Sequence, residues 1–122
     1  MKKHVIMIDY ENVQPNMQKI ENLSEPFVLM VFCNKQNNIS IKNFKFLTQI
    51  KEKVEIIELL CGGKNALDFH IAFYLGCLIT KLKTNNTQFH IISKDNGFDN
   101  LVEFAKEFCG VSVVKEQSIP IF

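Results

Sequence analysis

Short apolar segments alternate along the chain with segments of helical periodicity, and this alternation restricts the accessible folds most strongly. Five segments have the length and the β-branched or aromatic content of buried strands: His4–Asp9, Phe27–Phe32, Val54–Leu59, Phe89–Ser93 and Val111–Val114. Helices are predicted between them, over Pro15–Leu23, Ile39–Glu52, Ala66–Leu82 and Gly97–Phe108. Strands that alternate with helices pair in parallel through right-handed crossovers, and continuously apolar strands are covered on both faces. The expected fold is therefore α/β, a three-layer sandwich around a parallel five-stranded sheet.

The length and the composition fit one compact domain. The 122 residues suffice for a single core, and 47% hydrophobic residues is ordinary for a globular protein. We therefore expect a single domain over residues 1–122. Its last segment, Lys115–Phe122, is expected to pack on the core or on a partner. Core positions are expected for most of the eleven Phe; a dimer or partner surface built from Phe46, Phe73 and the Ile121–Phe122 tail is the less favoured alternative.

The small net charge excludes a strong overall electrostatic field that would attract nucleic acid or a membrane surface. The formal net charge is +1, so any surface for nucleic acid must be local. Arg is absent, and Lys would therefore supply every phosphate contact. The most apolar segment, Ala66–Leu82, contains Asp68 and His70 and is too short for a membrane span, and the N-terminus lacks the pattern of a signal peptide. A cytoplasmic protein without a membrane partner is expected.

The four Asp residues fall where the predicted strands end or the predicted helices begin. Asp9 ends the first strand, and Asp95 follows the fourth by two residues. Asp68 and Asp99 lie in the first turns of the third and fourth helices. If the first strand is central and the second and fourth are its neighbours, these positions meet at the carboxyl edge of the sheet, where parallel α/β folds bind ligands. All four carboxylates are therefore expected on one rim.

Each Asp also has a purely structural interpretation. Asp68 and Asp99 would stabilise helix N-termini through the helix dipole, with Asn65 as the cap of the first helix and Asn96 or Asp95 as the cap of the second. Asp9 would hydrogen-bond to amides of the loop that follows it. Four carboxylates close together, however, repel one another unless a cation neutralises them. Without Cys or His nearby, such a cluster of hard oxygen ligands is typical of Mg²⁺ or Mn²⁺ sites.

Three motifs in chain order resemble those of PIN-like nucleases of the NYN branch. They are MIDYENV (Met7–Val13), KNALDFHIA (Lys64–Ala72) and SKDNGFDNLV (Ser93–Val102), and together they span nearly the whole chain. The resemblance implies a Rossmann-like PIN fold and a Mg²⁺- or Mn²⁺-dependent nuclease that acts on RNA, with single-stranded RNA favoured. It implies catalytic metal ligands at Asp9, Asp68, Asp95 and Asp99, and supporting roles for Glu11 and Asn12. Ser93 is expected to support the site by a hydrogen bond to the nucleic-acid backbone.

The chain departs from the family pattern in two places. Many PIN toxins carry a further acid on the second or third helix, and no acid lies within Ile39–Lys51. In the third motif an extra residue separates Asp95 from Asp99. These departures keep open the alternative of a catalytically inactive PIN-like scaffold that acts by binding protein or RNA.

Phosphodiester hydrolysis gives the predicted residues their roles. Two ions about 3.5–4 Å apart activate water, stabilise the leaving oxygen and neutralise phosphate charge. Asp9 and Asp95 would bridge the ions, with Asp68 and Asp99 at the outer positions. Loop residues at the same edge would bind the nucleic-acid backbone, namely Lys35, Lys64, Asn65 and Lys94. For each Lys a solvated loop charge is the alternative, and Tyr10 is the candidate for stacking on a base.

Other α/β proteins with an Asp at the end of the first strand fit less well. A haloacid-dehalogenase phosphatase requires D-x-D-x-T/V, whereas residues 9–12 read DYEN. A receiver domain requires an Asp after the third strand, whereas residues 61–63 read CGG. The expected function is therefore that of a metal-dependent endoribonuclease, of the toxin or defence type that the family resemblance suggests, and a homodimer or a protein partner is left open.

Overall fold

The structure, a computed structural model, describes residues 2–34, 38–59, 63, 65–82 and 86–122. Its strands are β1 (Lys3–Asp9), β2 (Phe27–Asn34), β3 (Val54–Leu59), β4 (Thr87–Ile92) and β5 (Val113–Glu116). Its α-helices are α1 (Ile41–Gln49), α2 (Ala66–Lys81) and α3 (Phe98–Cys109). Two 3₁₀ helices are η1 (Met17–Asn22) and η2 (Lys51–Lys53). This order confirms the predicted alternation of strands and helices.

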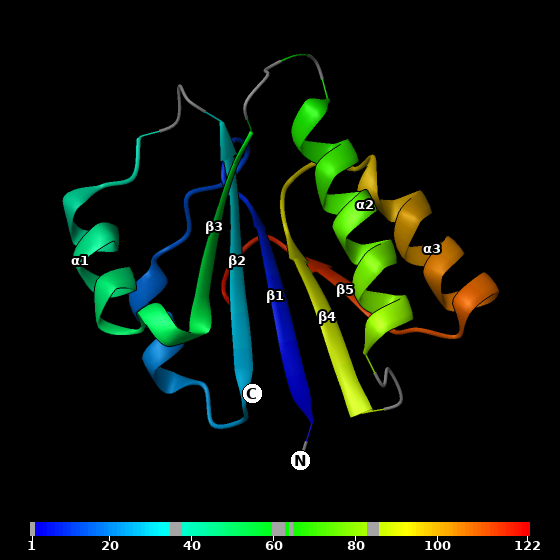
Figure 1. Cartoon of the computed structure of the whole chain (residues 1–122), viewed down its shortest axis with the longest axis horizontal. Coiled ribbons are helices and arrows are strands. Elements are labelled where there is room, and N and C mark those ends of the chain that lie inside the picture. Colours follow the sequence, from blue (N-terminus) through cyan, green and yellow to red (C-terminus); the bar gives the residue numbers. More distant parts are fainter. Residues whose placement is uncertain (1, 35–37, 60–62, 64, 83–85) are drawn as a thin grey trace.

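The five strands pair in parallel in the order β3-β2-β1-β4-β5, which places β1 at the centre (Figure 1). In this register Asp9 lies beside Phe32 of β2, and Ile8 lies beside Ile92 of β4. The chain runs outward from β1 in one direction through β2 and β3, and in the other through β4 and β5. The strand order therefore reverses at β1, as the interpretation of the sequence had assumed, and Asp9 lies at that point.

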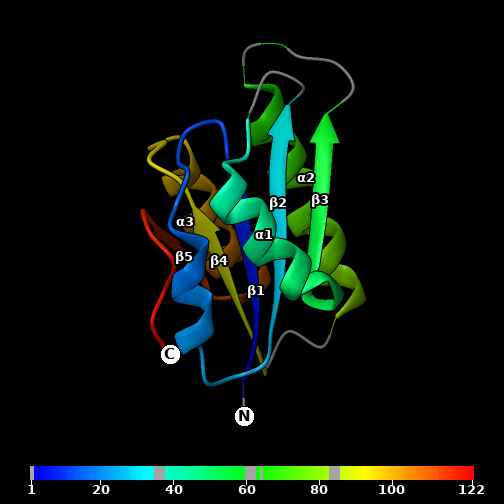
Figure 2. The ribbon, with the colours of Figure 1, turned by 90° about the vertical axis from the view of Figure 1, so that its left-hand side faces the viewer.

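Helices cover both faces of the sheet. One face carries α2 and α3, and the other carries η1, α1 and the C-terminal segment (Figures 1 and 2). Successive β1 residues alternate between two cores: Met7 packs with Ile71 of α2, and Ile8 packs on the side of Phe46 of α1. The predicted three-layer α/β sandwich is confirmed.

Two segments differ from their predicted structure. Pro15–Leu23, predicted as a helix, contains only the 3₁₀ helix η1, which Asn16 caps. β5 begins two residues later than predicted because Val111 still belongs to the end of α3. Gly110 there adopts a φ of 65°, and the Val111 amide donates to the Ala105 carbonyl at 3.1 Å. Residues at such a helix terminus satisfy helical carbonyls and cannot yet join a strand.

Two expectations about burial are wrong. β3 is an edge strand rather than a strand covered on both faces, and its Ile56 is 47% exposed. Most of the Phe are not in the core: only five of the eleven are buried. Five others are exposed, namely Phe44, Phe69, Phe73, Phe104 and Phe108. Both α2 and α3 therefore present aromatic side chains to solvent as well as apolar side chains to the sheet.

The C-terminal segment packs on the core. Ile119 is buried in the α1-side core, and the Phe122 ring stacks on the His4 ring with centroids 3.5 Å apart. The amide and the hydroxyl of Ser24 both donate to the Phe122 carbonyl, at 2.9 and 2.8 Å. Of the two alternatives for this tail, the structure shows packing on the core.

A pair of buried histidines lies next to the Phe122 ring. His4 Nδ1 and His90 Nε2 are 2.8 Å apart, so one ring donates and the other accepts. Burial, and then the charges of His4 and Lys2, lower the pKa of His90 to about 4. His90 is therefore neutral at pH 7, and its 3.7 Å approach to Glu116 is not an ion pair at that pH.

Acidification below pH 6.5 is expected to destabilise the fold through His90. The unfolded chain takes up this proton near pH 6.5 and the folded chain only near pH 4, so the free energy of unfolding falls as the pH drops through that window. Urea unfolding of the wild type and of His90→Gln at about pH 7.5 and about pH 5 measures this contribution as the difference between their two pH dependences, because the variant lacks the titrating imidazole. The same pH dependence in wild type and variant would contradict this assignment.

Candidate functional site

Asp9, at the carboxyl end of the central strand, is fully buried. Its Oδ2 accepts hydrogen bonds from Asn12 Nδ2 at 2.7 Å and from Ser93 Oγ at 2.8 Å. Its Oδ1 is also buried and has no hydrogen-bond partner among the described residues. A buried carboxylate oxygen without a partner is unfavourable, because it has lost its hydration without compensation. This atom therefore lacks the compensation that a hydrogen bond or a bound cation would supply.

Ser93 joins the ends of β1 and β4. It directly follows β4 and is fully buried. Its hydroxyl donates to Asp9 and accepts from the Asp95 amide at 3.0 Å. Its own amide donates to the Glu116 carbonyl of β5 at 2.9 Å. Because it is buried, Ser93 is placed to orient Asp9 and the Asp95 loop rather than to touch a substrate.

Asp68, from the first turn of α2, and Asp95, from the loop after β4, are in hydrogen-bond contact through their carboxyl groups. Burial, then this contact and the charges of Asp95, Asp9 and Glu11, raise the pKa of Asp68 to about 7. The Gly97 amide, which donates to Asp95 Oδ1 at 2.8 Å, and the contact with Asp68 lower the pKa of Asp95. Like charges this close do not both ionise readily, so the pair shares a proton when no cation is bound.

Asp99 is engaged elsewhere. Its Oδ1 pairs with Lys115 Nζ of β5 at 2.9 Å, and its side chain is 61% exposed. The same ammonium group donates to the Asp95 carbonyl at 3.2 Å and to Asn96 Oδ1 at 3.4 Å. The charges that raise the pKa of Asp68 do not include Asp99. Of the four predicted Asp, Asp68 and Asp95 interact with each other, Asp9 lies near enough for its charge to act on Asp68, and Asp99 pairs with a lysine.

The predicted nucleic-acid contacts are placed in part. Asn65 and Lys94 are exposed, beside Ala66 of α2 and beside Asp95. Asn65 has a φ of 62° and makes no side-chain cap bond, so its interpretation as a helix cap is wrong. Lys35 and Lys64 lie outside the described residues. Tyr10 is buried, so its assignment as a stacking platform for a base is wrong.

The donor set fits a hard cation, although it is not arranged as a finished site. As the side chains lie, no three His, Cys, Asp or Glu of the described residues form a group that could hold a metal ion. Asp68 and Asp95 instead share a proton, and Asp9 Oδ1 has no partner. A divalent cation in place of the proton would relieve both unfavourable features. All donors are carboxylate oxygens, which suit Mg²⁺ or Mn²⁺.

In the absence of divalent cations, Asp68→Asn is expected to stabilise the protein at alkaline pH. The folded chain keeps the Asp68 proton up to about pH 7, whereas an ordinary Asp releases it near 3.8. The free energy of unfolding therefore falls as the pH rises from about 3.8 to about 7, because the folded chain must then release this proton. The Asn side chain does not titrate, so the variant does not lose this stability. Urea unfolding with chelator at about pH 5 and about pH 8 measures it. The advantage of the variant must grow with pH; an advantage that shrinks would contradict the shared proton.

Lys115 is the site residue that sequence reasoning missed. The sequence had placed it in the C-terminal tail, but it lies in β5, beside Ile91 of β4. Its ammonium group fixes the turn that carries Asp95 and Asp99. One signal in the sequence could have indicated this role. Lys115 lies near the carboxyl end of the last strand, and parallel pairing of that strand with β4 brings the lysine to the same edge as Asp95.

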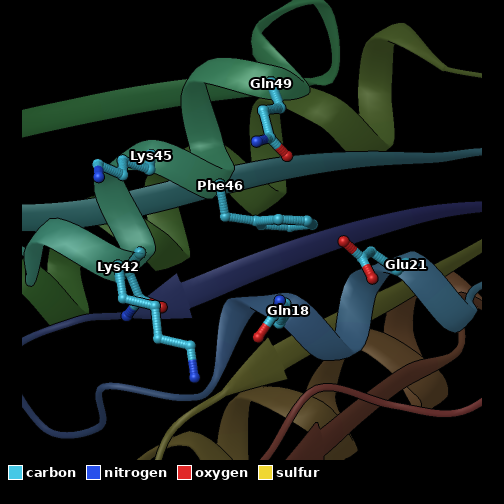
Figure 3. Close-up of a pocket in the computed structure, with 7 residues that line it drawn as sticks. Gln18, Glu21, Lys42, Lys45, Phe46 and Gln49 are labelled. Carbon is cyan, nitrogen blue, oxygen red and sulfur yellow. The ribbon is translucent and has the colours of Figure 1, made fainter.

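A separate cavity lies between η1 and α1, on the other face of the sheet from α2 (Figure 3). Its volume is about 190 Å³, and its walls are formed by Gln18, Glu21, Lys42, Asn43, Lys45, Phe46 and Gln49. Glu21 is its one carboxylate. The amide group of Asn43 already bonds to the Met17 amide and to the Pro15 carbonyl. This cavity therefore lacks the donors of a cation site, and the carboxyl edge remains the candidate.

Comparison with known proteins shows the family and a structure of similar fold. The PIN7 family model, described as a PIN domain, matches residues 3–116. No curated protein matches the chain. A solved structure of similar fold is that of VPA0982, a protein of unknown function from Vibrio parahaemolyticus. It shares 15% identity, with a TM-score of 0.66, over 93% of this chain and 80% of that one.

Proposed function

The chain belongs to the PIN domain family, whose members are typically metal-dependent nucleases, and from that premise we propose that it is a Mg²⁺- or Mn²⁺-dependent endoribonuclease of the NYN type. The observation that carries the proposal is the buried, unpartnered Asp9 Oδ1 at the same edge as the Asp68–Asp95 pair. The whole chain, residues 1–122, would form this one domain.

Three carboxylates would hold the ion. Asp9, fixed by Asn12 and Ser93, offers its free oxygen, and Asp68 and Asp95 offer theirs once their shared proton leaves. A divalent ion, when bound, neutralises charge on a phosphate and makes water nucleophilic at neutral pH. Because Asp9 cannot rotate without breaking two hydrogen bonds, it would set the position of the ion.

Asp99, predicted as a fourth ligand, is proposed to act at the border of the site. Its ion pair with Lys115 ties the turn after β4 to β5 and so supports the position of Asp95. Glu11 lies near enough for its charge to act on Asp68, and it would take the outer position instead.

The RNA backbone would approach over the exposed loops of this edge. Lys94 and Asn65 are exposed there. They would contact phosphate and sugar groups, together with Lys35 and Lys64 of the neighbouring connections. Contacts to phosphate and sugar do not distinguish one base from another, so we propose a substrate without strict sequence preference. Single-stranded RNA is the proposed form of this substrate.

A catalytically inactive PIN-like scaffold is the second candidate. It is favoured by the absence of a ready three-acid group among the described residues and by the pairing of Asp99 with Lys115. Such a protein would bind RNA or a protein partner without cleaving it.

Incubation of the purified protein with a labelled single-stranded RNA oligonucleotide tests the proposal. Internal cleavage is expected with Mn²⁺ or Mg²⁺ and is expected to stop when a chelator is added. A DNA oligonucleotide of the same sequence tests the preference for RNA. RNA that is bound but left intact with either metal would favour the scaffold.

A further inference from the structure

Helix α2 carries large apolar residues on the side that faces solvent as well as on the side that faces the sheet, although His70, Thr80 and Lys81 are also exposed. Leu67, Ile71 and Leu75 are buried against the sheet. On its outer side Phe69 and Phe73 are 71% and 72% exposed. A surface helix ordinarily presents polar residues to water, and a helix that is apolar all round is ordinarily buried. The outer side of α2 therefore has the composition of a covered surface.

The outer side of α2 forms a continuous stripe at helical spacing. Phe69, Ala72, Phe73 and Gly76 follow the i, i+3, i+4, i+7 pattern of one helix face. Large and small side chains alternate along it. A methyl group added at Gly76 would meet nothing within 4 Å, so the packing of this chain does not require a glycine there. The stripe thus consists of two aromatic rings, Phe69 and Phe73, and two positions with small side chains, Ala72 and Gly76, which we call shallow positions.

Helix α3 adds two aromatic rings on the same face of the sheet (Figure 1). Phe104 and Phe108 are 57% and 77% exposed, and their rings stack with centroids 4.9 Å apart. They lie on the flank of α3 opposite to Asp99, which pairs with Lys115 of β5. We call the surface formed by Phe69, Ala72, Phe73, Gly76, Phe104 and Phe108 the aromatic face.

The charges around the aromatic face exclude two kinds of occupant. No Lys lies within it, and although Lys81 borders Phe73, Glu103 and Glu107 neighbour its α3 rings, so the face lacks the basic patch that a phosphate backbone requires. A lipid surface is disfavoured for the same reason, because membrane-binding helices carry Lys or Arg along their polar face. None of the described helices has the length and apolar content to cross a bilayer.

The four Phe rings of the aromatic face alone supply more than half of the area of a standard dimer contact. Four Phe rings at these exposures present on the order of 500 Å² of apolar surface, against roughly 800 Å² per partner in a standard interface. An exposed apolar patch of this size is typical of a binding surface. We propose that the aromatic face is the contact between two copies of this chain.

The sequence of the stripe is complementary to itself across a two-fold axis. If two α2 helices cross antiparallel, Phe69 of one copy faces Gly76 of the other, and Phe73 faces Ala72. Each ring then enters a shallow position, as ridges enter grooves in packed helices. A partner of different sequence would need its own helix with the same alternation of large and small side chains. This dimer does not depend on the proposed nuclease activity.

Sedimentation velocity on three proteins tests the dimer. At about 50 µM the wild type is expected to sediment as a dimer, and Phe73→Lys is expected to weaken association by about thirtyfold or more. Phe44→Lys is the matched control, because Phe44 is 56% exposed but lies on α1 at the other face of the sheet, and it should remain a dimer. Circular dichroism checks that each variant is folded.

A mixing experiment tests the antiparallel arrangement. Ala72→Glu alone is also expected to be monomeric. Mixed with Phe73→Lys it should form a heterodimer, because the two new charges face each other across the axis. A monomeric wild type, or a Phe73→Lys variant that still sediments as a dimer, would overturn the proposal. Two monomeric variants that do not associate on mixing would overturn the arrangement of the helices.

Discussion

Asp95→Asn is expected to lower the rate of metal-dependent RNA cleavage by at least about a thousandfold, while the protein stays folded. The amide keeps the acceptor that Gly97 uses, so the turn after β4 is preserved. It removes the negative charge and the carboxyl contact with Asp68. A bound ion contributes several kcal/mol of charge stabilisation in phosphoryl transfer, which corresponds to a loss of this size.

Asp99→Asn is the matched control for Asp95→Asn. Both variants change one carboxylate of the same turn, but Asp99 forms an exposed ion pair with Lys115, and such pairs contribute little. Cleavage by Asp99→Asn is expected to fall by less than about tenfold. Single-turnover cleavage of a labelled RNA gives both rates. Equal losses in the two variants would contradict the assignment of the ion to Asp9, Asp68 and Asp95.

Mn²⁺ is expected to stabilise the wild type by about 2.7 kcal/mol at a concentration of about 100 times its dissociation constant. The gain follows from linkage, because the ion binds carboxylates that only the folded chain brings together. It also relieves the unpartnered Asp9 Oδ1 and the repulsion between Asp68 and Asp95. Urea unfolding with Mn²⁺ and with chelator measures the difference between the two states.

Asp9→Asn is expected to gain no stability from Mn²⁺. The substitution keeps the shape of the side chain at a fully buried position but removes the charge at the centre of the site. Without metal the variant is expected to be as stable as the wild type or slightly more stable. A variant that gains as much stability from Mn²⁺ as the wild type would place the ion elsewhere.

The fold could be predicted largely from the sequence because the strands are short apolar runs. β3 was predicted with its observed bounds, Val54–Leu59, whereas the central position of β1 had to be assumed, because the alternation of strands and helices does not determine the order of the strands. The start of β5 could not be predicted, because the amides of Gly110 and Val111 donate hydrogen bonds to carbonyls at the end of α3 instead of pairing with β4. The period of a helix is visible in the sequence, but which of its apolar sides meets the sheet is not.

The exposed aromatic residues show this limit clearly. Phe69 and Phe73 have the spacing of a core face, yet Leu67, Ile71 and Leu75 of the same helix take the core. Both sets follow the same period. The choice between them depends on the crossover that docks α2 on β1 and β2, which is a property of the tertiary structure.

The candidate site could be predicted to the level of strand and helix ends, but not to the level of side-chain partners. The edge shared by Asp9, Asp68 and Asp95 follows from parallel pairing. The burial of Ser93 between Asp9 and the Asp95 amide is set by the register of β1 and β4. The pairing of Asp99 with Lys115 requires β5 to lie beside β4, which the local sequence around Asp99 does not encode.

Calorimetric titration of Mn²⁺ into the metal-free wild type, with Asp95→Asn titrated in parallel, tests the central claim most directly. A saturable heat of binding to the wild type that is lost in the variant is the predicted result, accompanied by RNA cleavage only in the wild-type samples. No Mn²⁺ binding by a folded wild type would contradict a metal centre at the carboxyl edge, and the scaffold would then be the better account of this PIN domain.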